Sequence, residues 1–196
     1  MSVGWPVALQ HGNIGVRPLR RRDAATWARL RAANSAWLSP WEATLPPGAG
    51  EAVMSYRSMI ASLRRRARQG QTMPFAVTWD GDMVGQLTVN AITWGSARCA
   101  SIGYWVSRSH AGRGITPTAL ALVCDHLLGS VGLHRVEIAI RPENDASLRV
   151  AAKLGFAEIG IARGYLHIDG DWRDHRVFQM LAEDAYGGVL NRLVRH

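Results

Sequence analysis

The segment from 102 to 117 carries the residue types of an anion-binding site. Gly112 and Gly114 flank a single residue, and a helical pattern opens directly afterwards with Thr116 and Pro117. Glycine lets the backbone come close to a ligand, and the first amides of a helix have no acceptor within that helix. The helix dipole also favours negative charge at this end. The turn is therefore suited to hold a phosphate or a pyrophosphate.

Two better-known phosphate motifs do not fit this turn. The position three residues after Gly114 is Pro117, which excludes the six-residue dinucleotide fingerprint. No Gly-Lys-Ser/Thr sequence follows, so the segment is not a Walker loop either. A Gly-x-Gly pair also occurs in many ordinary turns, and the surrounding elements must decide how it is interpreted.

The elements around the turn follow the order strand, helix, strand. Residues 101–106 alternate in polarity, which predicts a strand, and a helical pattern then spans about 116–128. The apolar run at 134–140 predicts a second strand. A right-handed crossover of this kind makes the two strands parallel, at the centre of an otherwise antiparallel sheet. Ligands bind beyond the carboxyl ends of such strands, where residues 107–116 and 141–144 lie.

Three hairpins are predicted by alternating segments on both sides of turn residues. The turns contain His11-Gly12-Asn13, Asp80-Gly81 and Asp169-Gly170. The strands pair, in chain order, as 7–9 with 14–19, 75–79 with 84–92, and 156–167 with 174–181.

The N-terminal helices are predicted on either side of a loop. Asp23 is the expected N-cap of a first helix, and a second helix is expected from Glu51 with core residues at helical spacing. Residues 37–48 are predicted to be a loop because they end in Leu45-Pro46-Pro47-Gly48. Trp41 and Glu42 on this loop suggest a substrate lip or, alternatively, a loop held by aromatic packing. The core residues expected on the second helix are Val53, Tyr56, Ile60 and Leu63.

A short helix and its two ends complete the C-terminal half. Asn144 or Asp145 is the expected N-cap, and Ser147 is in the first turn. Gly155 stands where a left-handed residue closes a helix. The tail from Glu183 is expected to add a short terminal helix.

Four segments together closely resemble the GCN5-related N-acetyltransferases, the GNAT superfamily. Within it, the chain is most similar to the Rim-type ribosomal-protein N-terminal acetyltransferases, and residues 165–175 resemble the substrate-side hairpin of the RimJ branch. Ala111 and Thr116 depart from the superfamily's Gln/Arg-x-x-Gly-x-Gly/Ala loop, although the backbone makes most contacts there. The four segments are Ile102–Val106, Ala111–Thr116, Asn144–Ser147 and Lys153–Phe156.

The resemblance implies an α/β (α+β) GNAT fold. Its sheet is mixed and mostly antiparallel, with about seven strands, a central parallel pair and flanking helices. It also implies acetyl-CoA as cofactor and direct transfer of its acetyl group to a primary amine. The cofactor-binding residues implied are Tyr104, Trp105, Val106, Ser107, Ala111, Gly112, Arg113, Gly114, Ile115, Thr116, Asn144 and Ser147.

The resemblance also assigns roles in the chemistry. Ser147 would protonate the leaving thiolate, although a first-turn serine can be purely structural. Asn144 would bond the pantetheine or position a water, or act only as an N-cap. The amide of Val106 would donate to the thioester carbonyl oxygen as charge builds on it.

The general base is left open among three carboxylates. Glu158, Glu42 and Asp174 are the candidates, and each can equally be an ordinary strand or turn residue. Glu158 lies one position before the glutamate of a related Rim-type branch, where this chain has Ile159. The residues expected to line the acceptor side are Trp41, Glu42, Tyr165, His167, Trp172 and Asp174.

Composition is typical of a single soluble domain spanning 1–196, with 47% hydrophobic residues. No apolar run reaches membrane-spanning length and no signal pattern is present, so we expect a cytoplasmic protein. The two cysteines lack the spacing of metal ligands, so we expect no metal site. The net charge of +8 fits either a basic face for CoA or ribosomal RNA, or an arginine-rich solvated surface. A monomer and a homodimer are both compatible with the sequence.

The sequence therefore predicts transfer of acetyl from acetyl-CoA to the α-amine of a protein N-terminus, with a ribosomal protein as the expected substrate. One alternative is acetylation of a small amine such as an aminoglycoside, polyamine or amino acid, because one scaffold serves many acceptors. Another is a CoA-binding, ribosome-associated factor with little catalysis.

Overall fold

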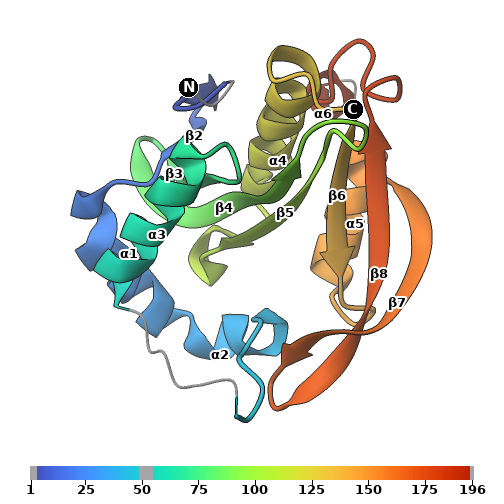
Figure 1. The fold of residues 1–196 in the computed structure, drawn as a ribbon. Coiled ribbons are helices and arrows are strands. Elements are labelled where there is room, and N and C mark those ends of the chain that lie inside the picture. Colours follow the sequence, from blue (N-terminus) through green and yellow to red (C-terminus); the bar gives the residue numbers. More distant parts are fainter. Residues whose placement is uncertain (1–3, 49–54, 195–196) are drawn as a thin grey trace.

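The computed structural model describes residues 4–48 and 55–194, which fold around one eight-stranded sheet (Figure 1). The strands lie in the order β1-β2-β3-β4-β5-β6-β8-β7, one more than the seven expected. Their bounds are β1 Leu9–His11, β2 Ile14–Pro18, β3 Met73–Trp79, β4 Asp82–Thr93, β5 Cys99–Val106, β6 Arg135–Ile140, β7 Ala157–Ile168 and β8 Asp171–Leu181.

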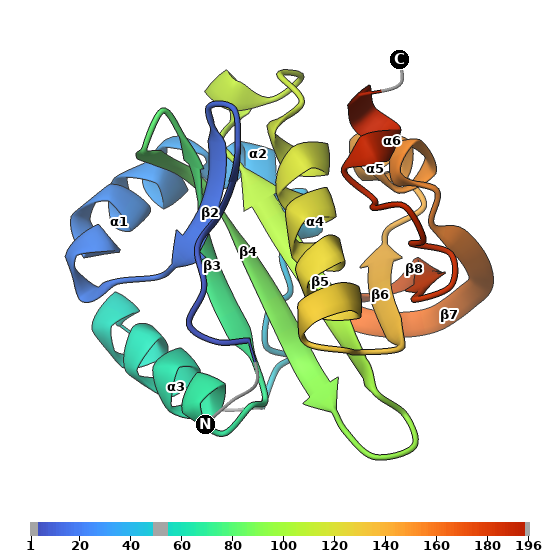
Figure 2. The same cartoon turned by 90° about the horizontal axis from the view of Figure 1, so that it is seen from above.

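Helices pack on both faces of this sheet (Figure 2). The larger core lies under α4 and α5, and a smaller one under α1 and α3 contains Leu19, Ile60, Ala76 and Met83. The helices are α1 Ala24–Ala33, α2 Ser35–Leu38, α3 Tyr56–Arg68, α4 Ile115–Asp125, α5 Asp145–Leu154 and α6 Asn191–Val194. Short 3-10 turns lie at Arg21–Asp23, Ser39–Trp41 and Arg108–His110, and a π-helical turn at His126–Ser130.

The predicted parallel pair is confirmed as β5 and β6, the one parallel pairing in the sheet. The pairing is short, because it joins only Cys99 to Arg135, Ala100 to Val136 and Ser101 to Glu137. Beyond these residues the two strands diverge (Figure 1). The remaining five residues of β5 therefore have a strand neighbour, β4, on one side only.

The predicted caps of α5 are confirmed, and α4 begins directly after the predicted glycine turn. Gly114 is the N-cap of α4 with φ 75°, a left-handed conformation that glycine adopts without strain. The side chain of Asn144 accepts a hydrogen bond from the Ser147 amide at 3.1 Å, and Gly155 closes α5 with φ 72°. These local signals fix the ends of both helices.

The loop predicted over 37–48 is wrong in its first half. Trp37 and Leu38 belong to α2, and Ser39–Trp41 form a 3-10 turn. Leu38 is 5% exposed, and Pro40 suits the start of such a turn because it has no amide to satisfy. The chain is extended at Glu42, and Ala43 then forms a β-bridge with Ile168.

Two further helix starts differ from the prediction. Asp23 makes no side-chain cap for α1; its carboxylate instead accepts from the Arg20 amide at 2.8 Å and pairs with Arg17 at 2.8 Å. The second helix starts at Tyr56 with Ser55 as its N-cap. The predicted residues Glu51 and Val53 lie outside the described residues.

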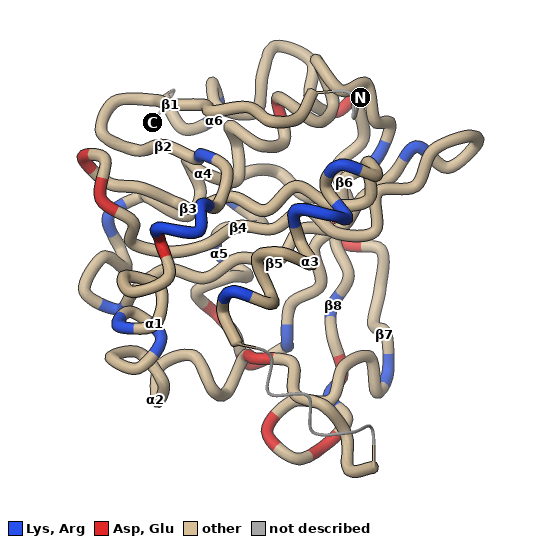
Figure 3. The backbone as a smooth tube through the Cα atoms, turned by 60° about the vertical axis from the view of Figure 1, so that its left-hand side comes forward, with Lys and Arg blue, Asp and Glu red and all other residues tan. Residues whose placement is uncertain are grey.

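Positive charge is distributed over several elements rather than gathered on one face (Figure 3). The last turn of α3 carries Arg65, Arg66 and Arg68, where cations suit the negative end of the helix dipole. Within the described ranges, no helix has the length and apolar character needed to cross a membrane.

A close approach of two strands fixes the end of β5. At Gly85 of β4, an added Cβ would overlap the carbonyl oxygen of Trp105 and lie 3.0 Å from the Val106 Cα. Only glycine therefore permits this spacing between β4 and β5 without a shift of the backbone.

We expect Gly85→Ala to lower the free energy of unfolding by about 1–3 kcal/mol, because overpacking forces the backbone to move. Chemical denaturation of the purified protein measures this change. Gly103→Ala is the matched control on β5, since the nearest atom to a Cβ there is the Asn90 Nδ2 at 4.0 Å. Equal losses in the two variants would contradict the prediction.

Candidate active site

The unpaired edge of β5 is the first part of the site. The Ser107 amide donates to the Val84 carbonyl at 2.8 Å. Ser107 and every second residue before it therefore direct their backbone N–H and C=O groups at β4. Because backbone groups alternate along a strand, those of Tyr104 and Val106 point to the opposite side. That is the side from which β6 has diverged. The Val106 carbonyl accepts from the Trp37 Nε1 at 3.3 Å, and the other groups can pair with an extended ligand that enters between β5 and β6.

The turn after β5 is the second part. Gly112 and Gly114 have φ of 77° and 75°, and Ala111, Gly112 and Arg113 are exposed. No side chain caps α4, so the first amides of the helix remain free of a side-chain acceptor. The arrangement keeps the backbone of residues 111–116 accessible to an anion, as the sequence predicts.

Asn34 holds this turn in place, and sequence reasoning missed it. Its side chain is buried at the end of α1 and accepts from the Arg108 amide at 2.8 Å. It also donates to the Leu30 carbonyl at 2.8 Å and exchanges hydrogen bonds with the Ser107 hydroxyl at 3.1 and 3.3 Å. Asn34 and Ser107 are 73 positions apart in the sequence, so no local signal indicates this contact.

Ser147 and Tyr104 meet on the α4–α5 face of the sheet. The Ser147 amide is bound by Asn144, which leaves its hydroxyl uncommitted to the cap. Burial raises the pKa of Tyr104 to about 12, and the nearby Ser147 hydroxyl opposes this rise. Their contact does not reach hydrogen-bond geometry, so the Tyr104 Oη is buried without a partner among the described residues. A polar group of a ligand would satisfy it.

The segment after α2 joins the acceptor-side hairpin formed by β7 and β8. The Thr44 amide donates to the His167 carbonyl at 2.8 Å, and the Thr44 hydroxyl lies 2.7 Å from the His167 Nδ1. The Arg141 guanidinium donates to the Pro40 carbonyl at 2.7 Å and lies over the Trp41 ring at 5.5 Å. These contacts bring Trp41 to the carboxyl end of β6 and beside β7.

Each of the three candidate base carboxylates has a protein partner. Glu42 forms an ion pair with Arg31, and Asp174 accepts from the Gly164 amide at 2.8 Å. Arg176 binds Glu158 through two hydrogen bonds of 2.8 and 2.6 Å and holds the pKa of that carboxyl below its usual range. Glu158 lines an open cavity of about 480 Å³ beside α5. The role of all three as base stays a prediction.

Aromatic residues of the hairpin form two pairs. The rings of His167 and Trp172 lie 5.8 Å apart, and those of Tyr165 and His175 lie 5.3 Å apart. Trp172 is 56% and Tyr165 46% exposed, which leaves both able to contact an acceptor. His175 was not among the residues predicted for the site.

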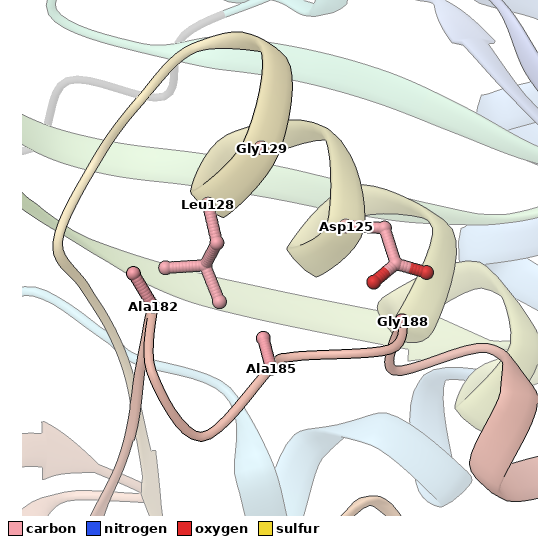
Figure 4. Close-up of a pocket in the computed structure, with 6 residues that line it drawn as sticks. All are labelled: Asp125, Leu128, Gly129, Ala182, Ala185 and Gly188. Atoms are coloured by element: carbon pink, nitrogen blue, oxygen red, sulfur yellow. The ribbon is translucent and has the colours of Figure 1, made fainter.

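Another cavity, of about 320 Å³, lies away from these groups (Figure 4). It is formed by Asp125, Leu128 and Gly129 at the carboxyl end of α4 and by Ala182, Ala185 and Gly188 of the C-terminal segment. The Asp125 carboxylate accepts from the amides of Val189 and Leu190. A helix of this length places the cavity about 16 Å from the glycine turn, so we assign it to packing of the C-terminal segment. The described part of the chain has no cluster of metal-binding side chains.

We expect Asn34→Ala to weaken CoA binding about tenfold, because the Arg108 amide loses its acceptor and the Ser107 hydroxyl keeps only Ser109 as a partner. A buried polar group left unsatisfied costs about 1–3 kcal/mol. Titration calorimetry with CoA measures the affinity. Asn90→Ala is the control, because the Asn90 side chain donates only to Thr88 of its own strand, at 3.2 Å. Unchanged affinity in Asn34→Ala would show that Asn34 does not support the turn.

Comparisons with known proteins agree with this geometry. The chain is 31% identical to a probable N-acetyltransferase, YjcK, of Bacillus subtilis, over 90% of this chain and 98% of that protein. It is 28% identical to the [ribosomal protein uS5]-alanine N-acetyltransferase of Escherichia coli, over 91% and 92%. The solved structure of Mycobacterium smegmatis RimJ in complex with CoA-disulfide is 43% identical, with a TM-score of 0.93 and coverage of 100% and 97%. Residues 13–157 match the family described as the acetyltransferase (GNAT) domain, and the chain therefore belongs to the GNAT acetyltransferases.

Proposed function

We propose that this enzyme transfers the acetyl group of acetyl-CoA to the α-amine of a protein N-terminus, with a ribosomal protein as substrate. The observation that carries the proposal is the divergence of β5 from β6, together with the glycine turn that follows the end of β5. The 43% identical RimJ was solved with CoA-disulfide, and a 28% identical relative is named [ribosomal protein uS5]-alanine N-acetyltransferase.

The residues present fit acetyl-CoA along the whole opening. The backbone amides of 111–116 bind the pyrophosphate, and the backbone groups of Tyr104 and Val106 pair with the pantetheine arm as a neighbouring strand would. Trp105 and Ser107 hold β5 against β4 and keep that edge in place. Bound acetyl-CoA supplies an activated acyl group, and the Val106 amide stabilises charge on its carbonyl oxygen.

Ser147 donates a proton to the departing thiolate. The support is that its hydroxyl takes no part in the α5 cap and lies beside the unpartnered Tyr104 Oη. Asn144 acts in this scheme through the cap, which fixes where the serine stands. Tyr104 is fully protonated at neutral pH, because burial raises its pKa to about 12, and it can donate to the same region.

The acceptor reaches the thioester from the hairpin side. The exposed Tyr165 and Trp172 and the half-buried Trp41 offer aromatic surface to the first residues of a peptide. An α-amine has a pKa of about 7.7–8.0 and is partly neutral at pH 7, whereas a lysine at about 10.4 is almost entirely charged. This difference favours the N-terminus over lysine side chains.

The first experiment measures CoA release from acetyl-CoA with a panel of acceptors, with products identified by mass. The panel contains N-terminal peptides of ribosomal proteins starting with Ala, Ser or Thr, the same peptides blocked at the α-amine but retaining a lysine, and several small amines. We expect turnover only with free α-amines. Turnover with the small amines alone, or with none of the acceptors despite CoA binding, would overturn the proposed function.

Ser147→Ala tests the proposed proton donor. The Asn144 cap uses the backbone amide of residue 147, so the substitution leaves the cap intact and the melting temperature unchanged. We expect kcat to fall about 100-fold, the lower end for loss of a general acid. Steady-state kinetics with the best peptide of the panel measure the effect. A variant with full kcat would assign Ser147 a structural role only.

A further inference from the structure

His175 lies on the face of the sheet that α5 does not cover. Phe178 and Met180 of β8 point into the core beneath α4 and α5. Side chains alternate along a strand, so His175 points to the opposite face, toward α1 and α2. Arg176 pairs with Ile140, the last residue of β6. His175 is the residue before Arg176 in the chain and therefore lies beside the carboxyl end of β6. This is the end from which β5 and β6 diverge.

The hydrogen bonds of His175 fix its tautomer. Its Nδ1 lies 3.1 Å from the Arg173 carbonyl. Because a carbonyl only accepts, Nδ1 carries the proton and Nε2 carries a lone pair. No described residue hydrogen-bonds Nε2. His175 as a whole is 3% exposed. Among the described residues, the Tyr104 Oη is the only side-chain polar atom that is both fully buried and without a hydrogen-bond partner. The Nε2 of His175 has no such partner, so it keeps some contact with solvent.

The surroundings keep this imidazole neutral. Burial lowers its pKa below the usual 6.5, and Arg141 at the end of β6 acts in the same direction. The Arg173 carbonyl, Glu143 and Asp174 act in the opposite direction but do not restore the pKa. Tyr165 of β7 covers the ring. At pH 7 the group therefore presents a free acceptor, which can bind an N–H donor.

The carboxylates near the hairpin do not offer the same chemistry. Glu42 is paired with Arg31, Glu158 with Arg176, and Asp174 with the Gly164 amide. Glu158 is also separated from His175 by the sheet, because Arg176 points to the α5 face with Phe178. His175 is thus a hairpin histidine whose acceptor atom has no protein partner, beside the end of β6.

We propose that His175 binds the α-ammonium group of the acceptor through Nε2 and takes its proton, an inference that rests on the acetyl transfer proposed above. The neutral amine then forms the N–C bond while the C–S bond breaks. The second amine proton ends on the thiolate through Ser147, and the proton on His175 returns to solvent. Nothing is oxidised or reduced, and no further reactant is needed.

This assignment also explains a preference for N-termini. Transfer of a proton from an α-ammonium to His175 is easier than transfer from a lysine by about 2.5 pKa units, whatever the pKa of the histidine. The discrimination between the two kinds of primary amine therefore comes from the pKa values of the amines and does not depend on the strength of the base.

The test compares wild type, His175→Gln and His134→Gln in the pH dependence of kcat/KM for an N-terminal peptide. Glutamine keeps a hydrogen-bonding group but does not titrate. In the wild type, kcat/KM stays level as the pH falls until His175 is protonated, below 6.5. In His175→Gln only the free amine reacts, so the fall of kcat/KM toward acid pH (the acid limb) moves to about pH 7.7–8.0. The kcat/KM of this variant at pH 6.5 is then about 20-fold below its value at high pH. His134, paired with the exposed Glu183 at the other end of β8, is the matched control and keeps the wild-type profile.

A second readout needs neither turnover nor a variant. In the ¹⁵N NMR spectrum of the wild-type protein, His175 is expected as the Nδ1–H tautomer at pH 7, with a midpoint below 6.5. A peptide with a free α-amine shifts the Nε2 resonance, and the same peptide with a blocked amine does not. An Nε2–H tautomer, or an acid limb in His175→Gln at the wild-type position, would overturn the role of His175 alone. A wild type inactive on every peptide would overturn the proposed function as well.

Discussion

The short parallel pairing between β5 and β6 is the constraint on which the rest of the structure depends. Three residue pairs join the strands, and beyond them Tyr104 and Val106 have β4 as a strand neighbour on one side and no strand on the other. Buried backbone groups require a hydrogen bond, so an opening of this kind stays stable only where a ligand or solvent completes it. Gly85 allows β4 to hold β5 from the other side, and α4 covers the core beneath the opening. The proposed cofactor site is therefore an opening between two strands of the sheet rather than a separate pocket.

The same divergence gives the reaction two sides. Ser147 and Tyr104 reach the opening from the α4–α5 face, where the thiolate needs a proton. The hairpin and the segment around Trp41 reach it from the face of α1 and α2, where the amine arrives. The proton donor for the thiolate and the proton acceptor for the amine therefore lie on opposite faces of the sheet. The sheet keeps them apart and lets both act on one bond.

Most of the fold follows from local signals, and the exceptions have physical reasons. Strand alternation, the glycine turn and the caps at Asn144 and Gly155 act within a few residues, and the structure has all of them as predicted. The segment 37–41 was predicted as loop together with the run Leu45-Pro46-Pro47-Gly48 that follows it, whereas the buried Leu38 decides its structure. Asn34 could not be found from sequence, because its partners are 73 and 74 residues away.

The acceptor side was harder to predict, because its geometry depends on strand register. Glu158 and His175 are both polar residues of one hairpin, and nothing in their spacing says which face either occupies. The pairing of β7 with β8 shifts between Glu158 and Gly160 and again between Ala162 and Leu166. Each bulge inserts residues without a partner and resets the alternation of β7 against β8. The core residue Phe178 fixes the register of β8, and this places Glu158 with Arg176 on one face and leaves His175 on the other. Burial of one aromatic residue thus decides which polar side chain can meet the amine.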